Sequence, residues 1–204
     1  MANNDTKYKQ YALDVINGNI VACRYIKLAS HRFLNWFDRK DIEFREDKVD
    51  KVVNFISKLK HYTGKHNNQP FILQDWQKFI VANIFGWYWK DTDKRVTKRV
   101  YIEVARKNGK SALISAIALY CLIADNENGA EVDVAANSRQ QGKILFDMAS
   151  NFIQGLDTKH KYFKPYRDRM PSVVRTFPLA VGFPRPSSER GQWCQVGRWW
   201  CSCR

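Results

Sequence analysis

The segment from Val100 to Ile123 constrains the fold of this chain most strongly, because its pattern changes abruptly within a few residues. Apolar and polar residues alternate from Val100 to Val104, as they do in a half-buried strand. A polar turn with a single glycine, Gly109, follows. The run from Ala112 to Ile123 is then almost entirely apolar, which predicts a buried helix. The order of strand, tight loop and helix is typical of an α/β protein.

The loop carries the triplet Gly109-Lys110-Ser111 at the point where the strand gives way to the helix. At such a junction, backbone N–H groups and the positive end of the helix bind phosphate oxygens, a lysine adds a cation, and a serine hydroxyl binds Mg²⁺. The pattern therefore predicts a site for a nucleoside triphosphate. Val104 occupies the position of the first glycine in the standard pattern G-x-x-x-x-G-K-[ST], so the loop is a variant. A chance Gly-Lys-Ser at a helix start is the alternative.

Arg106, three residues before Gly109, extends the motif to Ala-Arg-Lys-Asn-Gly-Lys-Ser. With this loop the chain resembles the large terminase subunit of tailed bacteriophages. The resemblance covers about residues 8–170 and includes residues 20–32, 70–87 and 132–141, which look like the family's leading helices, its adenine-contacting segment, and its next strand and helix start. In that family, ATP hydrolysis drives double-stranded viral DNA into a preformed capsid, and a separate nuclease domain cuts the DNA.

The resemblance implies ATP and Mg²⁺ as cofactors and a site built from seven residues: Gln77, Arg106, Lys107, Asn108, Gly109, Lys110 and Ser111. Gln77 is the implied contact to the adenine edge, because one amide offers both a donor and an acceptor, and Gln74 is the alternative. Lys110 is implied to bind phosphate and Ser111 to bind Mg²⁺. Arg106 is implied as a trigger that stabilises charge in the transition state. Whether Arg106 acts on its own nucleotide or only positions the loop stays open.

We expect an α/β fold in which an N-terminal helical region leads into the first part of a P-loop ATPase parallel sheet of the ASCE type. The expected boundaries are residues 1–68 for the helical region, 69–170 for a partial ATPase domain and 171–204 for an atypical tail. Periodicity predicts helices over residues 5–17, 20–39, 47–62, 74–85 and 139–155, with a break at Gly18 and a strand over 132–136. Ser138 is positioned to cap the last helix. Much of one apolar stripe is expected from Val21, Tyr25, Leu28, Phe33 and Trp36.

The formal net charge of +14 exceeds what ATP binding needs and indicates a polyanionic partner, with a merely basic surface as the alternative. The resemblance implies double-stranded DNA as this partner, the portal protein and small terminase subunit as protein partners, and a ring of subunits only at full length. The sequence contains neither a membrane-length apolar run nor a signal-peptide pattern. We therefore expect no membrane span and a location in the cytoplasm of the bacterial host.

The cysteines do not predict a metal site. Cys23 and Cys121 occur in apolar helical patterns and are expected to be reduced core thiols. Cys194, Cys201 and Cys203 crowd the C-terminal end without the spacing of a zinc site.

The composition changes after about residue 170. All 19 lysines precede this point, whereas residues 171–204 hold four of the six prolines and three of the seven tryptophans. We interpret this tail as the product of a shifted reading frame. A genuine basic, aromatic tail that binds nucleic acid is the alternative.

We expect the terminase strand that ends in Asp-Glu and the nuclease domain to be absent, because no apolar segment within these 204 residues ends in Asp-Glu. Whether the chain is an active enzyme therefore stays open, and we expect ATP binding without hydrolysis. Asp133 is expected within its strand, where it is a poor substitute for the missing acids. If the chain does turn over ATP, the acid would come from Glu103, Asp125, Glu127 or Asp133. The alternatives to a terminase fragment are a non-enzymatic basic DNA-binding module and a P-loop helicase-like ATPase.

Overall fold

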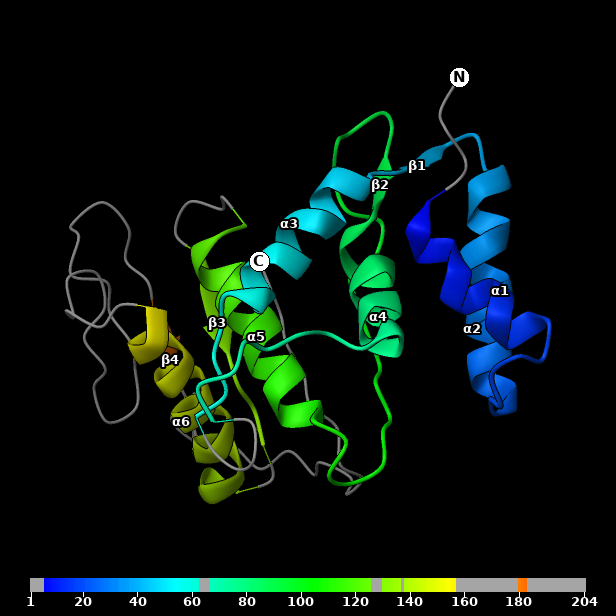
Figure 1. Cartoon of the computed structure of the whole chain (residues 1–204). Helices are drawn as coiled ribbons and strands as arrows, with labels where there is room; N and C mark the ends of the chain where they lie inside the picture. Colours follow the sequence, from blue (N-terminus) through cyan, green and yellow to red (C-terminus); the bar gives the residue numbers. More distant parts are fainter. Residues whose placement is uncertain (1–5, 63–66, 126–129, 137, 157–179, 183–204) are drawn as a thin grey trace, which may run out of the picture. The chain divides into compact units, whose positions relative to one another are not determined.

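The computed structural model describes residues 6–62, 67–125, 130–136, 138–156 and 180–182. The chain divides into two compact units (Figure 1), Met1–Asn54 with Ile72–Val100, and Phe55–Phe71 with Tyr101–Arg204. We call them the first and the second unit. Apart from residues 180–182, the predicted tail lies outside the described residues, and the three predicted domain boundaries remain predictions.

The first unit combines helices with one short antiparallel ribbon. Its elements are η1 (Lys7–Lys9), α1 (Gln10–Ile16), α2 (Arg24–Asn35), η2 (Trp36–Asp38), β1 (Ile42–Phe44), most of α3 (Glu46–Ser57), α4 (Asp75–Phe85) and β2 (Trp87–Trp89). Strands β1 and β2 pair with Ile42 opposite Trp89 and Phe44 opposite Trp87. The sequence analysis did not predict this pair, because each strand has three residues and their partners are more than 40 residues apart.

The predicted break at Gly18 is confirmed. Gly18 has a φ of +82°, a conformation that glycine adopts without a steric penalty. Just before it, the N–H of Asn17 donates to the carbonyl of Leu13 at 2.8 Å and closes α1. The next helix begins at Arg24, later than expected.

The predicted stripe on α2 is wrong for three of its residues. Phe33 is fully buried, but Val21, Tyr25 and Leu28 are exposed. Residues five apart on an α-helix point about 140° apart, so Leu28 and Phe33 lie on different faces of α2. Helix α2 therefore has two apolar faces, and only the one with Phe33 packs into the core.

Helix α3 also differs from the expectation, because it ends at Ser57 rather than near residue 62. The N–H groups of Lys58 and Leu59 donate to carbonyls three residues back, which tightens the last turn. The chain is extended beyond this point, and Lys60 forms an antiparallel bridge with Pro70.

An aromatic core fills the first unit, and we define it as Phe33, Phe37, Phe44, Phe79 and Trp87. Phe33 meets the other four rings edge-on at centroid distances of 5.3–5.6 Å. Such edge-to-face pairs each add about 0.5–1.5 kcal/mol beyond the burial of area. Gly86 lies against this core, since a Cβ there would come within 2.2 Å of the Phe44 ring. The core thus fixes α2, α4 and the β1–β2 ribbon relative to one another.

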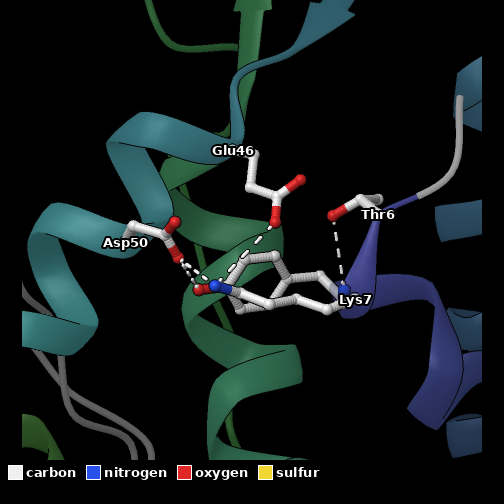
Figure 2. A network of polar contacts seen from close by, with 5 residues as sticks. Thr6, Lys7, Glu46 and Asp50 are labelled. Carbon is white, nitrogen blue, oxygen red and sulfur yellow. Dashed lines mark hydrogen bonds and ion pairs between the residues drawn. The ribbon is translucent and has the colours of Figure 1, made fainter. Parts of the chain in front are cut away.

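A polar network joins the start of the chain to α3 (Figure 2). Lys7 Nζ lies 2.8 Å from Asp50 Oδ1 and 3.9 Å from Glu46 Oε1, and the Tyr8 hydroxyl donates to Asp50 Oδ1 at 2.5 Å. Burial and this bond to a carboxylate raise the pKa of Tyr8. Burial opposes ionisation of Asp50, but the bonds from Lys7 and Tyr8 outweigh it and lower the pKa of Asp50 below 3.8. Asp50 is therefore the hub of the network.

The second unit contains α5 (Lys110–Ile123), β3 (Glu131–Asp133), α6 (Arg139–Leu156) and β4 (Ala180–Gly182). Helix α5 is buried over most of its circumference, and the Ser115 hydroxyl donates to the carbonyl of Leu145 in α6 at 3.1 Å. The predicted cap of α6 is confirmed, because Ser138 Oγ accepts from the N–H of Gln141 at 3.3 Å. Figure 1 shows α5 and α6 beside each other in green and yellow.

The strands of the second unit differ from the prediction. Strand β3 is shorter than the expected 132–136, and its described partner is β4, which pairs with it in parallel. Residues 100–104 belong to no strand in the described structure, although Ile102 and Val104 are half-buried between the exposed Tyr101 and Glu103. Exposed and half-buried side chains therefore do alternate. A strand, however, is defined by hydrogen bonds to a neighbouring strand, and the sequence of one segment does not show whether such a partner exists. The α/β class is consistent with this mixture of helices and short strands.

Candidate phosphate-binding site

The loop before α5 has a backbone conformation that suits anion binding. Gly109, at the N-cap of α5, has a φ of +70°, and Lys107 has a φ of +69°. Left-handed residues that alternate with right-handed ones turn successive N–H groups to one side and form a concavity for anions. The positive φ angles of Lys107 and Gly109 are therefore compatible with the anion-binding loop that the sequence motif predicts, and phosphate binding by residues 105–111 stays a prediction.

Lys107 is the unusual member of this loop. In the described part of the chain, the other non-glycine residues with a positive φ are Asn68 and Asp93. Asn and Asp adopt this conformation readily, whereas a lysine pays about 1–2 kcal/mol. Strain of this kind is concentrated at ligand-binding sites. Nothing in the sequence signals that Lys107 is left-handed.

Helix α5 directs its positive end at this loop. It has 14 residues and no acidic side chain in its first turn. The carbonyl of Gly109 accepts from the N–H of Leu113 at 3.0 Å, but no side chain caps the helix start. The first N–H groups of an α-helix lack intrahelical partners and carry a partial positive charge. Because Leu113 is 1% exposed, the core anchors the helix one turn after the loop.

The side chains of the loop add further positive charge. Arg106 and Lys107 are exposed, and Lys110 is half-buried. None of these three cations forms an ion pair with a described residue. The nearest acid along the chain, Glu103, accepts a hydrogen bond from the Tyr101 hydroxyl at 3.1 Å. Among the described residues, the loop therefore combines cations that form no ion pair with a helix start that no side chain caps, and both features suit a phosphate.

The two candidate adenine contacts lie at the start of α4, in the first unit. Gln77 is 4% exposed, and its Oε1 accepts from the backbone N–H of Gln74 at 2.9 Å. Gln74 is exposed, and its Oε1 accepts from the Trp76 indole N–H at 2.6 Å. The sequence did not show that Gln77 is buried and helps to cap its own helix. Its contact to adenine stays a prediction.

A cavity of about 670 Å³ also borders α4, but its chemistry differs from that of the loop. Asp75, Lys78 and Phe79 line it on this helix, whereas Gln74 and Gln77 do not. Lys78 Nζ lies 3.0 Å from Asp75 Oδ1, so this lysine is already paired. The cavity offers no free cation from α4 to a phosphate.

The acids considered for catalysis are dispersed. Asp133 is the last residue of β3 and is exposed, rather than being within a longer strand as expected. Glu127 lies outside the described residues. Among the residues that the structure describes, no three His, Cys, Asp or Glu side chains gather as a metal site.

Two further expectations concern cysteines and membranes. Cys121 is buried as expected, but Cys23 is exposed because it precedes the first turn of α2. The other three cysteines lie outside the described residues. No described helix is long and apolar enough to cross a bilayer.

Comparison with known protein families gives a match. The family described as terminase large subunit, ATPase domain, matches residues 75–176, which is half of the 204 residues. The match includes α4 and the whole loop before α5. Searches of curated proteins and of solved structures give no match.

Proposed function

The chain belongs to the family of terminase large subunit ATPase domains, and from this premise we propose that the loop from Ala105 to Ser111 binds the phosphates of Mg·ATP. In this proposal, Lys110 and the loop N–H groups bind the β- and γ-phosphates. Arg106 stabilises the charge that develops on the transferred phosphoryl group. The chain then acts in the motor that packages double-stranded viral DNA in the bacterial host, together with a portal protein and a small terminase subunit.

The observation that carries the proposal is the conformation of the loop at the start of a buried helix. Two left-handed residues, Lys107 and Gly109, lie directly before α5, and three nearby cations have no acidic partner in the described structure. A basic DNA-binding module explains the net charge but not a strained lysine at a helix start. The geometry therefore favours a compact polyphosphate as the ligand.

The residues also fit the magnesium ion that accompanies ATP. Ser111 is half-buried at the second position of α5, where its hydroxyl is the one protein ligand that the motif provides. Mg²⁺ commonly keeps several waters and takes other ligands from the phosphates, so one hydroxyl is a reasonable contribution. When bound, the ion neutralises charge on the phosphates. Lys110 would hold the phosphate oxygens beside it.

For the adenine edge we propose Gln77, with Gln74 as the second candidate. The backbone N–H of Gln74 donates to the amide oxygen of Gln77 and so fixes the orientation of this side-chain amide. This leaves the NH₂ group as a donor for an acceptor nitrogen of adenine such as N7. The capping bond would thus orient the amide for the base.

The decisive experiment is isothermal titration of Mg·ATP into the wild-type chain and the Lys110→Ala variant. We expect the variant to lose about 10- to 100-fold in affinity, the loss typical of one charge-assisted hydrogen bond. Lys143→Ala is the matched control, because Lys143 is exposed on α6 of the same unit and should not affect binding. Equal ATP affinity in folded wild-type and Lys110→Ala protein would show that the loop is not a nucleotide site.

A further inference from the structure

The outward face of α2 is apolar where a surface helix is usually polar. Tyr25 is 80% exposed and Leu28 is 53% exposed, and residues three apart lie on one face of a helix. Val21, in the segment that leads into α2, is fully exposed. We define these three residues as the outer stripe. Because they lie within eight positions of the chain, they are not randomly scattered apolar residues.

The core does not use this stripe. On the same helix, Ser30 and Phe33 are fully buried, and Phe33 belongs to the aromatic core. Removing Tyr25 or Leu28 from the surface would therefore leave the packing of α2 intact. Exposed apolar groups that contribute nothing to folding mark an interaction surface when they occur together.

The charged residues of α2 itself are all positive. Arg24 and Lys27 precede Tyr25 and Leu28 by one position each and so lie along one flank, and Arg32 follows Leu28 by one turn. No acidic residue occurs between Asp14 and Asp38. In the described part of the chain, no ion pair involves these three cations, although the Arg32 guanidinium lies 5.4 Å from the centre of the Trp36 ring.

We propose that the outer stripe and its basic flank are a docking site for an acidic amphipathic helix of another protein. The apolar side of such a helix would cover Val21, Tyr25 and Leu28, and its carboxylates would pair with Arg24, Lys27 and Arg32. Duplex DNA explains the cations, but its surface is dominated by charged phosphates and polar sugars, which suit three exposed apolar side chains less well than an apolar helix face. A second copy of α2 would bring like charges together. This site is independent of the nucleotide loop.

The test is a selection from a display library of random helical peptides on the full 204-residue chain. Peptides that also bind the Tyr25→Ser, Leu28→Ser double variant are removed. We expect the recovered helices to be net acidic, with apolar residues spaced three or four apart. Both serines lie on an exposed surface, so circular dichroism should show an unchanged fold.

One recovered peptide is then measured by fluorescence anisotropy against matched variants. The serine double variant and the Arg24→Glu, Lys27→Glu variant should each weaken binding by about tenfold or more. Lys51→Glu with Lys98→Glu makes the same charge change at exposed positions of the first unit and should have little effect. High salt should reduce the loss of affinity caused by the charge reversal but not the loss caused by the serine substitutions.

Four outcomes would overturn the proposal. The first is that the recovered peptides have no acidic bias, and the second is that they bind the serine variant as well as wild type. The third is that a 20-base-pair duplex binds wild type but not that variant. The fourth is that the chain self-associates in sedimentation and that the variant abolishes this self-association. The third outcome would assign the stripe to nucleic acid and the fourth to a second copy of the chain.

Discussion

Trp87 and Lys107 are held in place by opposite means. Trp87 is 1% exposed, and its indole meets Phe33, Phe37 and Phe44 at centroid distances of 4.8–5.6 Å. Lys107 is exposed and left-handed, and it forms no ion pair with any residue that the structure describes. Close packing against neighbouring rings therefore determines the conformation of Trp87. Lys107 instead adopts a left-handed backbone conformation that lysine disfavours.

The contrast separates stability from function in this chain. Packing in the aromatic core is redundant and requires no ligand, because four of its rings each contact at least three others, namely Phe33, Phe37, Phe44 and Trp87. The loop before α5 lacks such packing and keeps its donors and cations available. Changes in the core should therefore alter unfolding with little specific effect on ligands, whereas changes in the loop should alter ligand binding beyond any effect on stability. The four predictions below test this separation, from the largest expected effect to the smallest.

Trp87→Ala should cost about 3–5 kcal/mol in the free energy of unfolding, because it leaves a cavity among the aromatic rings. Chemical denaturation followed by circular dichroism measures this loss. Trp87→Phe is the control and should cost clearly less, since it keeps an aromatic ring and removes an indole N–H that has no hydrogen-bond partner among the described residues. A cost below about 1 kcal/mol for Trp87→Ala would contradict the proposed role of the aromatic core.

Gly109→Ala should cost about 1–2 kcal/mol, because alanine is strained at a φ of +70°. It should also weaken Mg·ATP binding by displacing the loop N–H groups. Gly18→Ala is a close control, since Gly18 has a φ of +82° and open space around it. We expect similar unfolding costs from the two variants but a loss of ATP affinity only at Gly109. If wild type and Gly109→Ala bound ATP with equal affinity in titration, the loop conformation would not contribute to binding.

Gln77→Ala should destabilise the protein by about 1 kcal/mol, because the N–H of Gln74 loses its partner at the start of α4. If Gln77 also contacts adenine, the variant should lose discrimination between ATP and GTP in competition titrations. Gln74→Ala removes the other side chain of this capping box and should cost a similar amount of stability, but it should leave the discrimination between ATP and GTP unchanged. Equal losses for both nucleotides in Gln77→Ala would restrict this residue to a capping role.

Asp50→Asn should produce the smallest effect, at most about 1 kcal/mol near neutral pH, because Asp50 is partly exposed to solvent. The folded protein holds the pKa of Asp50 below 3.8, so the carboxylate stabilises it fully above that pH. This contribution is lost as the pH falls through the pKa of the folded state. Thermal unfolding of wild type and variant should therefore converge in acid. Asp47→Asn, at an exposed site on α3, controls for the loss of one negative charge.

The helices could be predicted from the sequence more reliably than the strands. Helices α4 and α6 follow the apolar periodicity, and α5 follows its continuous apolar run. Gly18 and Ser138 act as the stop and the cap that their residue types indicate. The β1–β2 ribbon was missed, because its hydrogen bonds join segments that are distant along the chain. Periodicity within a segment also could not tell which of two apolar faces of α2 meets the core.

The candidate site shows the same limit at the level of single residues. Gly109-Lys110-Ser111 identified the loop, because its chemistry is encoded in residue types and their spacing. The left-handed Lys107 and the buried Gln77 were not foreseen. Both depend on the path of the surrounding backbone, which no short pattern specifies.

The uncapped start of α5 links ligand binding to the completion of a helix. Helix α6 begins with an internal cap, the hydroxyl of Ser138, whereas Gly109 provides no side chain for this purpose. A phosphate oxygen that accepts from the first N–H groups of α5 would take the place of the missing capping residue. Because such a ligand binds only the folded chain, saturation at 100 times the dissociation constant would add about 2.7 kcal/mol of stability. Nucleotide occupancy should then appear as slower amide hydrogen exchange in the first turn of α5.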